Sequence, residues 1–167
     1  MRKTKSYSGM SLLEILVVVA IFAVLGVITT RAVLLTLQGS KKSESLVRVR
    51  ENLNFALGVI ERQVRNADSV TECPNSDSNL LSYTDSSGDI ATFSCANVGT
   101  DDAYVASGSA RLTSDTVNIT SCSFVCAAGT STNPPSVTFS IEAKDKNTTG
   151  IQGSTVSMTT QIYLRNY

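Results

Sequence analysis

The fold is decided near the start of the chain by the stretch Gly9-Met-Ser-Leu-Leu-Glu-Ile-Leu-Val-Val-Val-Ala-Ile-Phe-Ala-Val-Leu-Gly-Val-Ile-Thr-Thr-Arg31. Between Met10 and Thr30 the stretch carries a single charge, on Glu14, and its length is about the 20 residues that a helix needs to span a bilayer. Residues 1–9, which precede Met10, form a short, polar and basic segment. We therefore expect a membrane-spanning helix with its basic leader on the cytoplasmic side.

A second helical pattern follows a short polar break at residues 38–40. Apolar residues recur there at steps of three and four, which indicates one buried helix face: Leu46, Val49, Leu53, Ala56, Ile60, Val64 and Ala67. No proline precedes Pro74, so both segments can form one helix, loosened at Gly26 or Gly39. We expect its transmembrane half at residues 10–37 and its amphipathic half at residues 38–67.

Beyond Asp68 the sequence changes to short β-like runs separated by turns. The predicted strands are Asn79–Thr84, Ile90–Cys95, Arg111–Thr113, Thr116–Val125, Ser136–Ala143 and Ser154–Arg165. Simple alternation places Val117 and Ile119 on one face of their strand, and Cys122 and Phe124 on the other. The sequence therefore predicts an α+β fold with the shape of a lollipop. A long N-terminal helix, membrane-spanning in its first half, packs against one small antiparallel β-sheet domain at residues 68–167.

Composition argues against several functional classes. From residue 68 onward the chain has four basic and ten acidic residues, a net charge near −6, which gives no attraction for phosphate backbones and argues against nucleic-acid binding. The chain has no histidine, the commonest general base and a common metal ligand. Neither a nucleophile elbow nor a phosphate-binding glycine loop is present. We expect no enzyme activity and no cofactor.

Two pairs of acidic residues offer oxygen ligands of the kind that calcium prefers. They are Asp85 with Asp89, and Asp101 with Asp102. Such pairs are more often solvated turn residues, so the sequence predicts no metal site.

The four cysteines, Cys73, Cys95, Cys122 and Cys126, all lie in the second half. An even number in a polar domain after an export-like N-terminus predicts disulfide bonds formed outside the cytoplasm. A zinc site would need all four thiolates, and the usual Cys-x-x-Cys spacing is absent. Three pairings are open. On one straight strand Cys122 and Cys126 would lie about 13 Å apart, beyond the roughly 7 Å Cα limit for a bridge. Either the strand bends or each bonds to one of the other two cysteines.

An ordinary secretory signal peptide also has a basic start and an apolar run. Glu14 argues against it, because a carboxylate at the edge of an apolar run is costly and needs a reason. A small-x-small cleavage site after the run is not evident either. A plain N-terminal membrane anchor is the other alternative.

The stretch from Gly9 to Glu14, after its basic leader, resembles the N-terminal processing motif of type IV prepilins and type II secretion pseudopilins. In that motif a glycine ends the leader, and the fifth residue after the cut is glutamate; counted from Met10, the fifth residue here is Glu14. The resemblance implies that prepilin peptidase removes residues 1–9 and methylates the amine of Met10. It also implies that Glu14 pairs with the N-terminal amine of a neighbouring subunit.

The resemblance implies a structural subunit of a pilus or related filament, anchored by a single pass in the bacterial cytoplasmic membrane with its C-terminal domain outside. Its partners would be other pilin or pseudopilin subunits and the inner-membrane assembly platform. Met10 stands where the family most often has phenylalanine, and the membrane half lacks the proline common in major pilins, so a minor pilin is favoured. The alternatives are a type II secretion pseudopilin, or a tip pilin whose β domain binds DNA or surfaces.

Overall fold

The computed structural model describes residues 11–72, 78–130, 134–148 and 155–165. One helix, α1 (Leu12–Arg65), is followed by eight strands: β1 (Ser69–Glu72), β2 (Leu80–Thr84), β3 (Ile90–Ala96), β4 (Tyr104–Ser107), β5 (Ala110–Arg111), β6 (Val117–Ala127), β7 (Ser136–Asp145) and β8 (Thr155–Tyr163). The chain divides into two compact units between Ser40 and Lys41. The fold has the predicted α+β layout of one long N-terminal apolar helix and antiparallel sheets.

The first unit contains the start of α1, and every described residue up to Ser40 is exposed. Gly26 and Gly39, where the helix was expected to loosen, both lie within α1. The predicted helix from Met10 to Ala67 is therefore present. It ends at Arg65, two residues before the predicted end, and Met10 lies outside the described residues.

In the second unit, α1 buries the predicted apolar stripe. Its completely buried apolar side chains lie three or four positions apart: Val49, Leu53, Ala56, Ile60 and Val64. Leu46 is only partly buried, and its neighbour Ser45 is buried instead. The Ser45 hydroxyl is hydrogen-bonded to the Thr148 hydroxyl at 2.9 Å, which satisfies this polar group inside the domain.

The strands form two antiparallel sheets, whereas the sequence predicted one. The first sheet has the order β1-β2-β3-β4-β5, and the second has the order β6-β7-β8. Five of the six predicted strands correspond to β2, β3, β6, β7 and β8. The sixth, Arg111–Thr113, shares only Arg111 with β5, and the short β1 and β4 were not predicted. The sheets are distinct because β6 pairs along its length with β7. Among the described residues, its backbone links to the first sheet's region are sparse: the bridge of Ser78 with Phe124, and a hydrogen bond from the Ile119 N–H to the Ala103 carbonyl.

A β-bulge in β6 corrects the predicted alternation. The register with β7 shifts between Ile119 and Ser121, so that Thr120 is an additional residue in this strand. One inserted residue reverses the parity of the side chains that follow it. Val117 and Ile119 before the bulge, and Cys122 and Phe124 after it, are consequently all buried.

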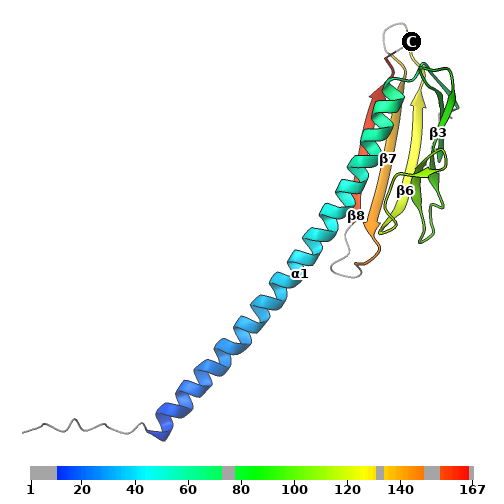
Figure 1. Ribbon diagram of the computed structural model, residues 1–167. Coiled ribbons are helices and arrows are strands. Elements are labelled where there is room, and N and C mark those ends of the chain that lie inside the picture. The colour runs from blue at the N-terminus through cyan, green and yellow to red at the C-terminus, as the bar shows by residue number, and fades with distance from the viewer. Residues whose placement is uncertain (1–10, 73–77, 131–133, 149–154, 166–167) are drawn as a thin grey trace, which may run out of the picture. The chain divides into compact units, whose positions relative to one another are not determined.

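The core of the second unit joins the helix to both sheets. In Figure 1 the second half of α1 runs alongside β7 and β8, while β3 lies beyond β6. Phe124 and Phe139 stack with ring centroids 4.6 Å apart, and Phe93 stacks on Tyr83 at 5.5 Å. All three phenylalanines are among the largest completely buried side chains. The second unit (residues 41–167), called the head domain below, therefore has one core, formed by the amphipathic half of α1 and two sheets.

Candidate functional site

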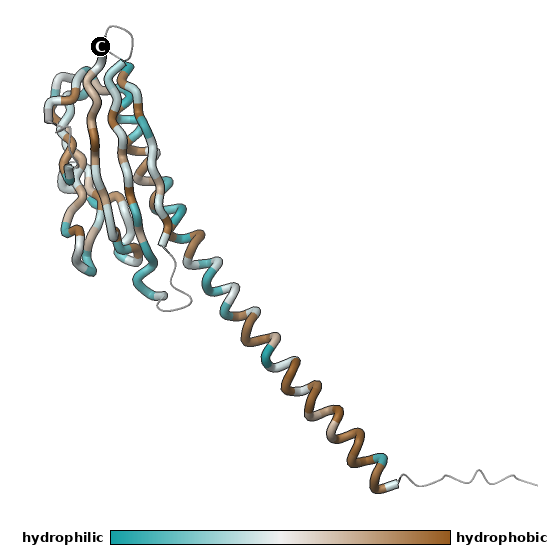
Figure 2. The backbone as a smooth tube through the Cα atoms, turned by 180° about the vertical axis from the view of Figure 1, so that it is seen from behind, coloured by the Kyte–Doolittle hydropathy of each residue, from teal (hydrophilic) through white to brown (hydrophobic). Residues whose placement is uncertain are grey.

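The first unit presents an apolar helix surface to its surroundings. Large exposed apolar side chains recur throughout α1 from Leu12 to Leu37, and Figure 2 shows this part of the helix as almost uniformly hydrophobic. By length and composition α1 can cross a membrane. So much exposed apolar surface is unfavourable in water and needs lipid or other protein to cover it.

The hydroxyl groups in this segment are satisfied within the helix. The Thr30 hydroxyl donates to the carbonyl of Gly26 at 2.8 Å, and the Thr36 hydroxyl donates to Ala32 at 2.9 Å. The Thr29 hydroxyl is within 3.0 Å of two such carbonyls. Hydroxyls bonded to their own helix can enter an apolar medium at reduced cost.

Glu14 lies in the first turn of α1, where the helix dipole favours a negative charge. Its side chain is exposed, and among the described residues it has no ion pair within 4.0 Å. Gly9 and Met10, the predicted processing residues, lie outside the described residues. The described residues therefore supply no cationic partner for the Glu14 carboxylate.

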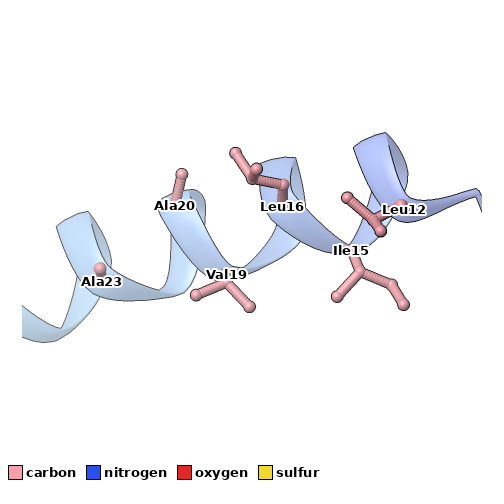
Figure 3. Close-up of a pocket in the computed structure, with 6 residues that line it drawn as sticks. All are labelled: Leu12, Ile15, Leu16, Val19, Ala20 and Ala23. Atoms are coloured by element: carbon pink, nitrogen blue, oxygen red, sulfur yellow. The ribbon is translucent and has the colours of Figure 1, made fainter.

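In the same part of the helix, but not on the side that carries Glu14, α1 has a shallow apolar groove (Figure 3). Its walls are two rows of side chains four residues apart: Leu12, Leu16 and Ala20 in one row, and Ile15, Val19 and Ala23 in the other. Rows of this kind are the ridges and grooves into which another helix packs. The two alanines allow a close approach of the partner's backbone. The groove is thus suited to helix–helix contact.

The cysteines act in the head domain. Cys95 of β3 and Cys122 of β6 form a disulfide bond with Cα atoms 6.0 Å apart, which joins the two sheets. Cys122 thus bonds to Cys95 and not to Cys126, one of the outcomes that strand spacing left open. Cys126 is also disulfide-bonded. Cys73 lies outside the described residues.

The acidic pairs have structural contacts. The Asp85 carboxylate accepts hydrogen bonds from the backbone N–H groups of Ser87 and Asp89, so it closes the β2–β3 turn. The Asp102 carboxylate lies 3.3 Å from the Arg111 guanidinium and 3.5 Å from the Lys146 ammonium. In the described part of the chain no group of three or more metal-ligating side chains occurs.

One exposed feature of the helix was missed from the sequence. The outward face of α1 in the second unit carries Phe55, which is 60% exposed, and beside Gly58 it has a hollow. The helical periodicity of the sequence could have located this feature, since Phe55 and Gly58 both fall outside the buried stripe.

Comparison with known families gives one match. Residues 4–30 match the model of the prokaryotic N-terminal methylation motif, which is the prepilin signature of type IV pilins and pseudopilins. No curated protein and no solved structure matches the chain. The matched residues contain the end of the leader (residues 4–9), Glu14 and most of the exposed apolar part of the helix.

Proposed function

Starting from a chain that carries the prepilin signature, and is thus a type IV pilin- or pseudopilin-like subunit, we propose that it is a minor pilin of a type IV pilus or a related filament. It is cleaved after Gly9, methylated on Met10 and assembled through its N-terminal helix. The observation that carries this proposal is the match at residues 4–30 running into an exposed, membrane-compatible helix.

The proposed topology follows from charge and redox chemistry. The leader's basic residues, Arg2, Lys3 and Lys5, favour the cytoplasmic side of the membrane. The disulfide-bonded head domain then lies outside the cytoplasm, where disulfides persist. One pass through the cytoplasmic membrane satisfies both requirements.

Glu14 has a specific role in this proposal. A lone carboxylate in a low-dielectric setting is costly, and a cationic partner makes it tolerable. After cleavage, the new amine of Met10 on a neighbouring subunit supplies such a charge. The pair fixes the axial register, while the groove lined by Leu12, Leu16 and Ala20 supplies apolar contact.

The choice of a minor pilin rests on Met10 and on the absence of proline from the membrane half of the helix. A pseudopilin of a type II secretion system would use the same helix and is the alternative. A DNA-binding tip pilin is disfavoured, because residues 68–167 carry a net charge near −6. We propose a structural role and no catalytic one.

The proposal is tested by the intact mass and N-terminal sequence of the protein from its native cell envelope. A chain beginning with N-methylated Met10 is expected. A chain that begins at Met1 would show a plain membrane anchor, and one that begins beyond Thr30 would show a secreted protein; either result overturns the proposal. Deletion of the gene then distinguishes a pilus from a type II secretion system. A loss of pili indicates a pilin, and a loss of protein secretion indicates a pseudopilin.

A further inference from the structure

The outward face of α1 in the head domain has a hollow that nothing within the described chain explains. It measures about 210 Å³ and is lined by Gly58, Glu61, Arg62, Arg65 and Asn66. A Cβ atom built on Gly58 would meet no described atom within 4 Å, so no packing inside the chain requires glycine here. Glycine is among the poorest residues for a helix interior. Its use at this position leaves room for something outside the chain.

The rim of the hollow combines an apolar surface with a free positive charge. Phe55 precedes Gly58 by three residues and Arg62 follows it by four, so both are its neighbours on the helix surface. Phe55 is 60% exposed, and exposed Arg62 has no ion pair among the described residues. Arg65, in contrast, is paired with Glu61. The rim therefore fits a partner that offers an apolar side chain beside a carboxylate.

The β2–β3 turn of the same chain presents such a surface. Ile90 is 72% exposed, and the adjacent carboxylate of Asp89 has no ion pair within the described part of the chain. The turn is held in place because the Asp85 carboxylate accepts N–H hydrogen bonds from Ser87 at 2.8 Å and Asp89 at 3.0 Å. A turn fixed in advance loses little conformational entropy on docking.

The wider charges agree with this pairing. Residues 41–67 contain six basic and three acidic side chains, a net charge of +3, while residues 68–167 carry about −6. Opposite net charges on two segments of one chain favour contact between copies.

We propose that the Gly58 hollow receives the β2–β3 turn of a second copy of this chain, with Ile90 against Phe55 and Asp89 against Arg62. This inference rests on the proposed function as a filament subunit and names one contact of its head domain. Because the two surfaces differ, the contact is head-to-tail, with the hollow of one copy facing the turn of the next.

The test places the photo-crosslinking residue p-benzoylphenylalanine at position 55 of the full-length chain. A minor subunit meets its own kind only where copies enter the filament together, so the chain is overproduced in its native envelope. Irradiation is expected to give a covalent dimer in which residue 55 is linked to the peptide containing Ile90. The matched control is the same substitution at Tyr163, an exposed aromatic residue on β8, which should not label that peptide.

Charge reversal provides the second arm. Arg62→Glu should reduce the cross-link at least fivefold, and adding Asp89→Lys should restore it, while Lys144→Glu, at an exposed position outside both surfaces, should leave it unchanged. A residue-55 cross-link to another part of the chain or to a different protein overturns this inference alone. The N-terminal mass is read in the same samples, and a chain beginning at Met1 overturns the proposed function and this contact together.

Discussion

Cys95 and Cys122 are bonded to each other although they belong to different sheets, with Cα atoms 6.0 Å apart and a separation of 27 positions in the sequence. Apart from this bond, the described backbone links between the two sheet regions are the isolated bridge of Ser78 with Phe124 and a 3.4 Å hydrogen bond from the Ile119 N–H to the Ala103 carbonyl. The disulfide therefore joins two layers that share a core but little continuous pairing.

Removing this disulfide should destabilise the head domain. The variant Cys95→Ala with Cys122→Ala is expected to lose about 3 kcal/mol of unfolding free energy, because a cross-link over a loop of this length restricts the unfolded chain. Urea unfolding of the full-length protein in detergent, followed by circular dichroism, measures the loss. Either single substitution should cost about as much as the pair. An unchanged midpoint would show that the core alone holds the sheets together.

A second bond is expected between Cys73 and Cys126. Cys126 is disulfide-bonded, Cys95 and Cys122 bond to each other, and Cys73 is the one cysteine of the sequence that remains. Peptide mapping under non-reducing conditions should therefore recover a peptide pair containing Cys73 and Cys126. A free thiol at Cys73, detected by alkylation before reduction, would contradict this pairing.

The helix and most of the strands could be predicted from the sequence because their signals are periodic and local. The stripe from Val49 to Val64 follows the helical period closely, and it is buried in the structure. The strands β6, β7 and β8 were found because each is nine residues or longer. The matched prepilin motif at residues 4–30 was likewise readable as fixed spacing.

What the sequence could not predict depends on pairing between distant residues. The bulge at Thr120 is visible only in the register of β6 with β7, and it reverses the side-chain alternation expected for Cys122. The four-residue β1 and β4 are too short to show a pattern of their own. The hollow beside Gly58 was missed because an exposed glycine looks the same in sequence whether or not something docks there.

The pH dependence of stability should show the ionisation of Tyr83. Burial, and secondarily the negative charge of Asp85, raises the pKa of the Tyr83 phenol above 10.0. Because the folded-state pKa is raised, the unfolded chain loses this proton first as pH rises. The contribution of Tyr83 to the free energy of unfolding is therefore fully present below pH 10 and is lost as pH rises through the folded-state pKa. Urea unfolding at pH 8 and at several values above 10 measures this decline.

Tyr83→Phe is the informative comparison, since lysines also titrate at high pH. The variant should lose about 1 kcal/mol at pH 8, because the Tyr83 hydroxyl donates a 2.7 Å hydrogen bond to Gln63 Oε1. Its further loss above pH 10 should be smaller than that of the wild type. Parallel curves for the two proteins would exclude Tyr83 as a source of the decline.

The ion pair between Arg48 and Asp145 should matter more than other charges on the helix. The Asp145 side chain is 1% exposed, and one carboxylate oxygen lies 3.7 Å from the Arg48 guanidinium while the other accepts the Asn147 N–H at 2.7 Å. Arg48→Met leaves this carboxylate buried without its cation and should cost about 2 kcal/mol, discounted because Arg48 is partly exposed.

Arg50→Met is the matched control for that substitution. Arg50 is exposed and has no ion pair in the described residues, so its loss should change unfolding free energy by less than about 0.5 kcal/mol. Equal effects of the two substitutions in urea unfolding would mean that the Asp145 contact contributes nothing beyond general surface charge.

Glu14 should be required for assembly and dispensable for membrane insertion. Glu14→Ala and Glu14→Leu make the apolar segment more hydrophobic, so the chain should still enter the membrane. Breaking a buried ion pair costs about 3–5 kcal/mol, and each 1.4 kcal/mol is a factor of ten, so incorporation into filaments should fall by at least about tenfold. Membrane fractionation and quantitative pull-down of sheared filaments measure the two steps separately.

Glu51→Ala, at an exposed position of the same helix without an ion pair in the described residues, is the control and should assemble normally. Normal incorporation of either Glu14 variant would show that no subunit uses this carboxylate to pair with its neighbour's amine, and the exposed apolar face of α1 would then have to supply the contact alone.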